Sequence, residues 1–141
     1  MAEVFRAEAL GLQGFKKQVA IKRVLPSIAA KETFIKMFLD EARLSARLSH
    51  SNCVQVFDIG VGDNTYFIVM EFVPGETLDT IIARDGALDL ARALDYTCQI
   101  CNAVDHAHRQ GVLHRDLRPS NVLVADSGLL KVADFGTSRF L

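Results

Sequence analysis

Apolar and polar positions in the first part of the chain follow first the period of a strand and then that of a helix. Residues 18–24 form an apolar-rich run that ends before Pro26, which predicts a strand as the first element. In residues 33–48 the apolar side chains recur three and four positions apart. That spacing predicts an amphipathic helix, and Thr33 is a suitable N-cap residue.

Further strand-forming runs occur in two pairs, each pair separated by residues typical of turns. The first pair is 54–59 and 65–73, around the turn 60–64; the second pair is 122–124 and 130–133, around the turn 125–128. Between the pairs, the pattern predicts a short helix from Thr77 and a longer helix over 89–108. Strands therefore gather early and helices late, which is typical of an α+β fold rather than a βαβ repeat.

Composition indicates one packed domain. The chain has 141 residues, of which half are hydrophobic and 23% are charged, so it can bury a core of its own. The 16 Lys and Arg residues nearly balance the 17 Asp and Glu residues, which does not favour a nucleic-acid partner. No apolar run is long enough to span a bilayer, and three cysteines cannot all pair, so a reducing, cytoplasmic setting is expected.

Glu41 is difficult to explain as a surface residue, because it falls within the apolar stripe of the predicted 33–48 helix. It lies three and four positions after Phe38 and Met37, where an unpaired carboxylate would be costly. Lys22 is a matching cation among the apolar side chains of the first predicted strand. An ion pair between Lys22 and Glu41 would satisfy both charges; the alternative is that both long side chains reach solvent.

Two acidic motifs follow each other closely near the end of the chain. The segment 114–121 reads HRDLRPSN, and residues 133–136 read ADFG. At about one chance in 20 for each fixed residue, the four defining residues of the first motif would occur by accident in about one such chain in a thousand. The nearby Asp-Phe-Gly makes a joint accident several hundred times rarer still.

These motifs resemble those of a protein kinase catalytic domain, and the style of the sequence is similar to bacterial Hanks-type serine/threonine kinases. The resemblance covers nearly the whole chain. The VAIK sequence ending at Lys22 is similar to the third-strand lysine motif, and Glu41 matches the acid of the following helix. Residues 66–74 resemble the strand that leads into the adenine-binding hinge. Pro119 favours the serine/threonine class.

The resemblance implies ATP and Mg²⁺ as cofactors and assigns roles to the motif residues. Lys22 would hold the α- and β-phosphates and Glu41 would hold Lys22. Asp116 would orient the attacking hydroxyl, and Asn121 and Asp134 would be the metal ligands. The remaining implied site residues are Arg118 near the γ-phosphate, Val4, Ala20 and Leu123 around the adenine, Glu71 and Val73 in the hinge, and Gly136 at the metal-binding turn.

The sequence also departs from the family pattern. Ala2 stands where the last glycine of the phosphate loop usually lies, and Arg118 replaces the usual lysine. Ser45 is small and polar where many kinases carry a larger apolar residue, which predicts a looser column between the lobes. We therefore expect a partial, two-lobed kinase-like fold, with residues 1–73 as N-lobe and residues 74–141 as hinge, first C-lobe helices, catalytic loop and DFG turn.

The resemblance implies a serine/threonine protein kinase that acts on a protein substrate. Because the glycine-rich loop and the activation segment are not in these 141 residues, weak transfer by the chain on its own is expected. A catalytically incomplete nucleotide-binding or interaction fragment is the main alternative, and a small-molecule phosphotransferase is a lesser one. Cys98 and Cys101, near His106 and His108, admit a zinc site, although buried structural cysteines explain the same spacing.

Overall fold

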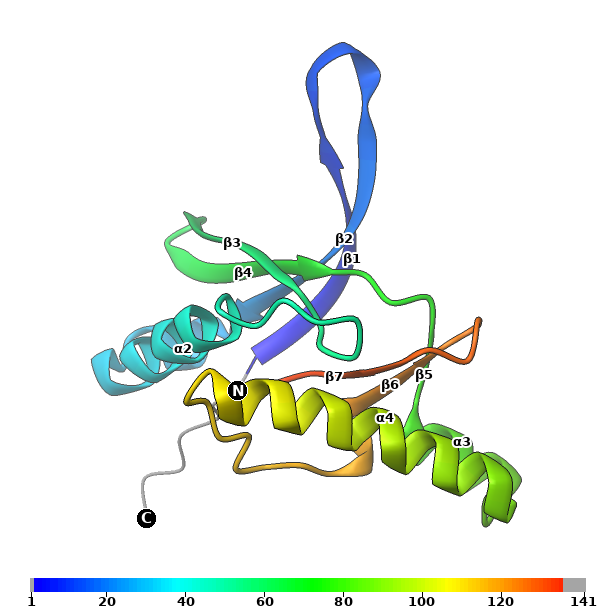
Figure 1. The fold of residues 1–141 in the computed structure, drawn as a ribbon. Helices are drawn as coiled ribbons and strands as arrows, with labels where there is room; N and C mark the ends of the chain where they lie inside the picture. Colours follow the sequence, from blue (N-terminus) through cyan, green and yellow to red (C-terminus); the bar gives the residue numbers. More distant parts are fainter. Residues whose placement is uncertain (1, 136–141) are drawn as a thin grey trace.

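The computed structural model describes residues 2–135, which form two antiparallel sheets and two long helices (Figure 1). The larger sheet has the order β1-β2-β4-β3 and comprises β1 (Ala2–Leu10), β2 (Lys16–Val24), β3 (Val56–Gly62) and β4 (Thr65–Glu71). The smaller sheet has the order β5-β6-β7 and comprises β5 (Gly75–Thr77), β6 (Val122–Ala125) and β7 (Leu130–Val132). The expected α+β architecture and both predicted hairpins are therefore confirmed.

The first element is β1, which the pattern of residues did not predict. The sequence of β1 mixes charged and apolar residues without a buried face, and only Ala2 and Ala7 are less than fully exposed. Edge strands of this kind lack the alternation that marks a half-buried strand. β1 pairs with β2 from Ala2 opposite Val24 to Leu10 opposite Lys16, which makes a hairpin that projects beyond the sheet (Figure 1).

The helix α2 (Glu32–Ser45) packs its apolar face against the larger sheet and follows the short α1 (Pro26–Ala29). Phe38 and Ala42 are buried together with Val24 of β2 and Ile68 of β4. α2 ends three residues before the predicted boundary, and its N-cap position is held by Lys31 rather than Thr33. The amphipathic period located the helix, but terminal residues depend on local backbone geometry.

The turn between β3 and β4 is tighter than predicted. It consists of Asp63 and Asn64, whose φ values of 49° and 58° lie in the left-handed region. Asn and Asp tolerate this conformation better than most residues, and two such residues match the twist of a hairpin. The glycines at 60 and 62, which had suggested a longer turn, belong to β3 itself.

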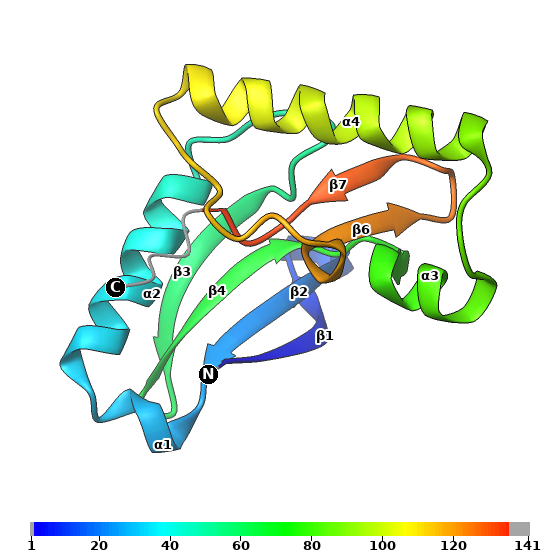
Figure 2. The same ribbon diagram turned by 90° about the horizontal axis from the view of Figure 1, so that it is seen from below.

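The second half of the chain surrounds the smaller sheet with helices α3 (Leu78–Asp85) and α4 (Leu90–Arg109), as Figure 2 shows from below. Thr77 precedes α3, and the Asp89 side chain caps α4 by accepting a hydrogen bond from the Arg92 N–H. Ala103 and Ala107 of α4 are fully buried with Leu130 and Val132 of β7. Both predicted helices are present.

Two features of this half position the loop between α4 and β6. A side chain at Gly75 would collide with the carbonyl oxygen of Val124, so the β5–β6 pair requires glycine there. The short 3₁₀ helix Pro119–Asn121 leads directly into β6. The predicted lobe boundary near residue 73 stays a prediction. No helix among residues 2–135 is long and apolar enough to cross a membrane.

Candidate active site

Lys22 lies at the centre of a group of charges drawn from three distant parts of the chain. Its Nζ donates to Glu41 Oε1 at 2.8 Å and to Asp134 Oδ1 at 3.1 Å. The Lys22 and Glu41 side chains are only 15% and 12% exposed, while that of Asp134 is 37% exposed. The predicted ion pair between Lys22 and Glu41 is thus present, and the strand, the helix and the DFG segment meet at one ammonium group.

This arrangement shifts the pKa values of both partners of the buried pair. Burial alone would lower the pKa of Lys22, but attraction by Asp134 and Glu41 and the hydrogen bonds to them together raise it above its ordinary 10.5. Burial raises the pKa of Glu41 above its ordinary 4.5, and Lys22 offsets this only in part. The pKa of Lys22 rises because two carboxylates surround one ammonium group, and the pKa of Glu41 rises because its burial outweighs the attraction of Lys22.

The raised pKa of Lys22 predicts a loss of stability in alkali. The folded chain holds the Lys22 proton more tightly than the unfolded chain, so this contribution is complete below pH 10.5 and is lost as the pH rises through the folded-state pKa. The free energy of unfolding should therefore fall more steeply above pH 10.5 in the wild type than in Lys22→Met. Urea titrations of both proteins across that range measure the difference. Parallel curves would contradict the prediction.

The loop before β6 holds Asp116 by hydrogen bonds from both sides. The Asp116 N–H donates to His114 Nδ1 at 3.2 Å, which leaves the proton of a neutral His114 on Nε2, where it donates to the Ala133 carbonyl at 2.8 Å. Asn121 Nδ2 donates to the Asp116 carbonyl oxygen at 2.8 Å. The Ala133 N–H donates to the Asn121 carbonyl at 2.9 Å, so the loop is attached to the residue before Asp134.

The segment after β7 is tied to α2 by a contact that sequence reasoning did not foresee. Ser45 Oγ donates to the Phe135 carbonyl oxygen at 3.2 Å, and both residues are buried. The Phe135 ring contacts His114 with ring centroids 4.7 Å apart. Ser45 therefore links α2 to the DFG segment, and the expected looser column between the lobes stays a prediction. Asp134 has a φ of 59°, and Gly136 lies outside the described residues.

A hollow of about 300 Å³ opens beside this charge group. Lys22, Glu41 and Asp134 line it together with Val4 and the apolar side of α2. Ala20 of β2 and Leu123 of β6 lie outside its lining. The structure thus brings Val4 to the charged residues.

Three other expected site residues are not part of the lining of this hollow. Val73 is buried just after β4, and Arg118 is exposed before the 3₁₀ helix. The Glu71 side chain points to Lys131 on β7, with Nζ–Oε distances of 2.9 and 3.0 Å. The Glu71 side chain is therefore occupied by Lys131 and does not line the hollow beside Lys22.

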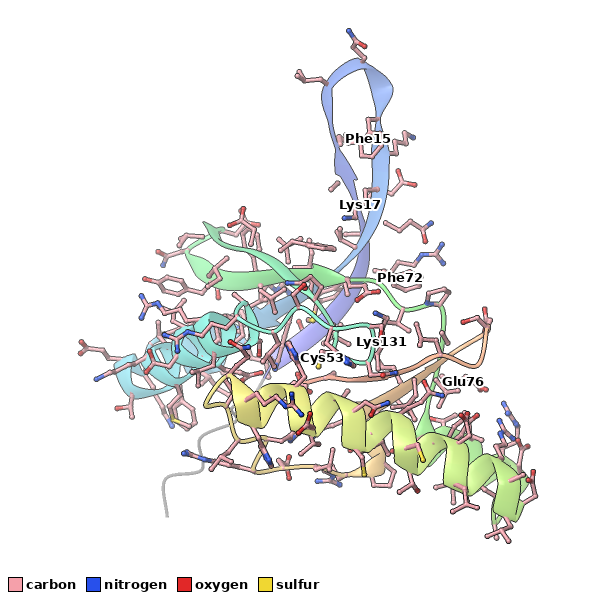
Figure 3. The ribbon with its side chains drawn as sticks, in the orientation of Figure 1. Phe15, Lys17, Cys53, Phe72, Glu76 and Lys131 are labelled. Atoms are coloured by element: carbon pink, nitrogen blue, oxygen red, sulfur yellow. The ribbon has the colours of Figure 1, made fainter. Side chains whose placement is uncertain are left out.

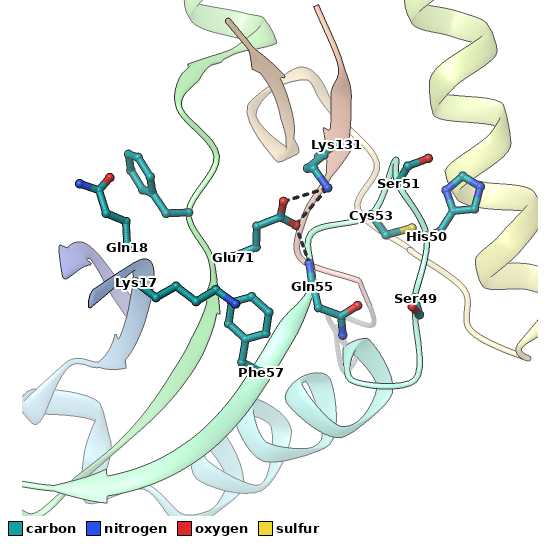
Figure 4. A pocket seen from close by; sticks show the side chains of 11 residues that line it. Lys17, Gln18, Ser49, His50, Ser51, Cys53, Gln55, Phe57, Glu71 and Lys131 are labelled. Carbon is teal, nitrogen blue, oxygen red and sulfur yellow. Dashed lines mark hydrogen bonds and ion pairs between the residues drawn. The ribbon is translucent and has the colours of Figure 1, made fainter. Parts of the chain in front are cut away.

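A larger recess of about 630 Å³ lies on the side to which the Glu71 side chain points (Figure 4). Glu71 also accepts a hydrogen bond from the Gln55 N–H at 3.2 Å, so it joins the end of β4 to the loop before β3 and to β7. The Lys131 and Glu71 side chains are 12% and 27% exposed. Burial raises the pKa of the neighbouring Cys53 to about 11, which keeps this thiol neutral and unreactive near pH 7.

Lys131→Ala should lower the free energy of unfolding by about 2 kcal/mol, because it leaves a largely buried carboxylate at Glu71 without its cation. Arg84→Ala is the matched control. Arg84 pairs with Glu76 on the surface, at 54% and 43% exposure, where solvent screening leaves such pairs with little effect on stability. Urea denaturation measures both changes. Equal losses in the two variants would contradict the prediction.

The cysteines of the CxxC sequence lie on the exposed side of α4. Cys98, Cys101 and the buried Cys53 are all free thiols. Within residues 2–135, no three His, Cys, Asp or Glu side chains are grouped so that they could hold a metal ion. Exposure of Cys98 and Cys101 also differs from the burial that the structural explanation of their spacing assumed.

Comparison with known proteins identifies the class of this fold and site. The family model described as protein kinase domain matches residues 7–141. The crystal structure of the Mycobacterium tuberculosis PknI kinase domain superimposes with a TM-score of 0.80 at 32% identity, covering 99% of this chain and 56% of that one. The chain therefore belongs to the protein kinase domain family, and the kinase-like fold expected from the motifs is confirmed.

The curated relatives include bacterial kinases named as serine/threonine-protein kinases and one named as a tyrosine-protein kinase. Serine/threonine-protein kinase PrkC of Bacillus subtilis is 40% identical over 141 residues, which is all of this chain and 21% of that protein. Tyrosine-protein kinase MasK of Myxococcus xanthus is 37% identical over 153 aligned positions, which cover 99% of this chain and 23% of that protein. The chain thus spans between a fifth and a quarter of the length of these relatives.

Proposed function

We propose that the kinase domain to which these residues belong transfers the γ-phosphoryl group of ATP to serine or threonine hydroxyls of protein substrates. The observation that supports this most is the position of Lys22 Nζ, 2.8 Å from Glu41 and 3.1 Å from Asp134. A fixed ammonium beside a carboxylate at the edge of a hollow suits a triphosphate and its metal ion. The family match and the relative named serine/threonine-protein kinase support the same activity.

In this proposal the residues of the chain act mainly by positioning and by charge. Glu41 holds Lys22 in place, and Lys22 binds the α- and β-phosphates. Asp116, held by the loop hydrogen bonds from Asn121 and to His114, orients the acceptor hydroxyl and receives its proton. Arg118 supplies positive charge near the γ-phosphate.

The donor groups fit Mg²⁺. Asn121 uses its side-chain N–H₂ group towards Asp116, which directs its hard amide oxygen to other partners, and Asp134 contributes a carboxylate. Bound Mg²⁺ would neutralise part of the phosphate charge. For the adenine we propose Val4, Ala20 and Leu123 as the apolar walls. Because the Glu71 N–H already donates to the Gln55 carbonyl at 2.8 Å, the Glu71 carbonyl would accept a hydrogen bond from the adenine, and the main chain of Val73 would complete the adenine site.

A cytoplasmic setting and an unidentified protein substrate complete the proposal. Three free thiols suit a reducing compartment. The balance of charges, 16 positive against 17 negative, supports a protein rather than a nucleic-acid partner.

The test uses the complete kinase domain that contains these residues, because weak transfer is expected of the 141 residues alone. Titration with a fluorescent ATP analogue, with and without Mg²⁺, tests the nucleotide site, and radiolabelled ATP with casein tests transfer. We expect Mg²⁺-dependent binding and label on serine or threonine after acid hydrolysis. Nucleotide binding without any transfer would favour the non-catalytic alternative. Label confined to tyrosine would contradict the serine/threonine specificity and favour a tyrosine kinase, as in the name of MasK. Absence of nucleotide binding would overturn the proposal.

A further inference from the structure

The outer part of the β1–β2 hairpin extends beyond the larger sheet and is exposed on both strands. Every residue from 8 to 18, here called the hairpin tip, is exposed. β2 pairs with β4 only from Val19 onward, so the tip is a two-stranded ribbon without a third strand. Figures 1 and 3 show it projecting away from both sheets, with Phe15 near its end and Lys17 closer to the sheet. Such a ribbon gains little stability from its own packing.

The tip nevertheless carries large apolar side chains. Leu10, Leu12 and Phe15 are 75%, 93% and 65% exposed. The glycines at 11 and 14 separate them, and Gln13 and Gly14 have left-handed backbone, so all three apolar residues lie in or next to the turn that joins β1 to β2. Apolar residues grouped on an exposed projection indicate a contact with another surface.

The tip is also positively charged, although the whole chain is not. The tip contains Lys16, Lys17 and one acidic residue, Glu8, which gives a local charge of +1 against −1 for the full sequence. Lys16 lies 3.6 Å from Glu8 in a pair that is 63% and 51% exposed, and Lys17 lies 3.8 Å above the Phe57 ring. Both lysines are exposed, and the two contacts leave part of each side chain open to solvent.

We propose that the hairpin tip docks on an anionic lipid surface, with its apolar side chains in the interface and its lysines among the headgroups. Apolar insertion combined with cationic attraction is the chemistry of peripheral membrane contacts. Shape and area favour lipid over protein. The tip is a narrow projection, and three side chains supply far less than the roughly 800 Å² that each partner contributes to a standard protein interface.

The chain contains no tryptophan, so a single introduced one reports the tip alone. Leu12→Trp is mixed with vesicles of phosphatidylcholine, or of phosphatidylcholine and phosphatidylglycerol in equal parts. We expect its emission to shift to the blue with the anionic vesicles only, and the shift to diminish in high salt because screening shortens electrostatic reach from about 10 Å to about 3 Å. Val61→Trp, at a 67% exposed position of β3, is the matched probe and should not respond.

Sedimentation with the same vesicles tests the charges. Lys16→Gln and Lys17→Gln should each weaken binding about fivefold, as expected for one cation near an anionic surface. Lys36→Gln removes an exposed lysine on α2 and should leave binding unchanged. Circular dichroism confirms that each variant is folded.

Several results would overturn the proposal. These are no shift at Leu12→Trp, an equal shift at Val61→Trp, or equal binding by the lysine variants. Self-association that shifts the Leu12→Trp emission without lipid would instead identify a second copy of the chain as the occupant.

Discussion

Asp116→Asn is expected to lower phosphoryl transfer by about 10²- to 10⁴-fold, the range that a positioned general base contributes. The change removes the charge and the proton-accepting oxygen while it retains the shape. The main-chain bonds of the residue, from Asn121 Nδ2 at 2.8 Å and to His114 Nδ1 at 3.2 Å, do not involve the carboxylate. The longer bond from Asn121 Nδ2 to Asp116 Oδ2, at 3.4 Å, can still be accepted by the amide oxygen of the variant. Nucleotide affinity and stability should therefore change little. Radiolabel transfer to casein and titration with the fluorescent nucleotide measure the two properties separately.

Asp126→Asn is the matched control for this variant. Asp126 is exposed after β6, and its main-chain N–H donates to the Pro74 carbonyl at 2.9 Å, a bond that the substitution retains. Transfer should persist in Asp126→Asn. Equal transfer by Asp116→Asn and the wild type would remove Asp116 from the proposed chemistry, whereas parallel loss of nucleotide binding would show that the loop itself had collapsed.

Lys22→Met is expected to lower the free energy of unfolding by about 3 kcal/mol at pH 7. The change leaves Glu41, whose side chain is 12% exposed, without the cation 2.8 Å away. Glu41 can escape by binding a proton, and at about 1.36 kcal/mol per pH unit this costs about 3.4 kcal/mol between its ordinary pKa of 4.5 and pH 7. Urea denaturation measures the loss. The nucleotide affinity should also fall at least about tenfold, because a charged hydrogen bond to phosphate disappears.

The pH dependence separates this explanation from simple loss of packing. The pKa of Glu41 is raised by burial and rises further without Lys22, so below pH 4.5 the carboxyl is protonated at no cost and the deficit of Lys22→Met should shrink. Lys16→Met changes an exposed lysine of the same strand and should cost less than about 1 kcal/mol at any pH. A deficit that is constant from pH 4 to pH 7 would contradict the ion-pair explanation.

Much of the site could be predicted because its chemistry is written in short motifs. Asp116 and Asn121 lie within a single loop, and Asp134 follows 13 residues after Asn121, so their order along the chain already indicated one site. The Lys22–Glu41 pair could be predicted because charges on apolar faces are costly unless they meet. Hairpins and helices followed from periods of two and of three to four residues, which are local properties.

The tertiary structure alone decided the features that depend on contacts between distant residues. The Lys22–Asp134 bond joins residues 112 positions apart, and the role of Ser45 depends on a carbonyl 90 positions away. Neither has a local signal. Glu71 was expected at the hinge. The pairing of β6 with β7 places Lys131 where it binds the Glu71 carboxylate, so this side chain lines the recess of about 630 Å³.

The hairpin tip shows the same division. The sequence of residues 9–18 already shows the leucines, the phenylalanine and the lysines. Their exposure, however, depends on where β4 stops pairing with β2. The sequence by itself determined the kinase motifs, the residues that carry charge and the strands and helices that present them. The structure decided which side chains meet and which are left to solvent, because burial and long-range pairing are properties of the packed chain and not of any one segment.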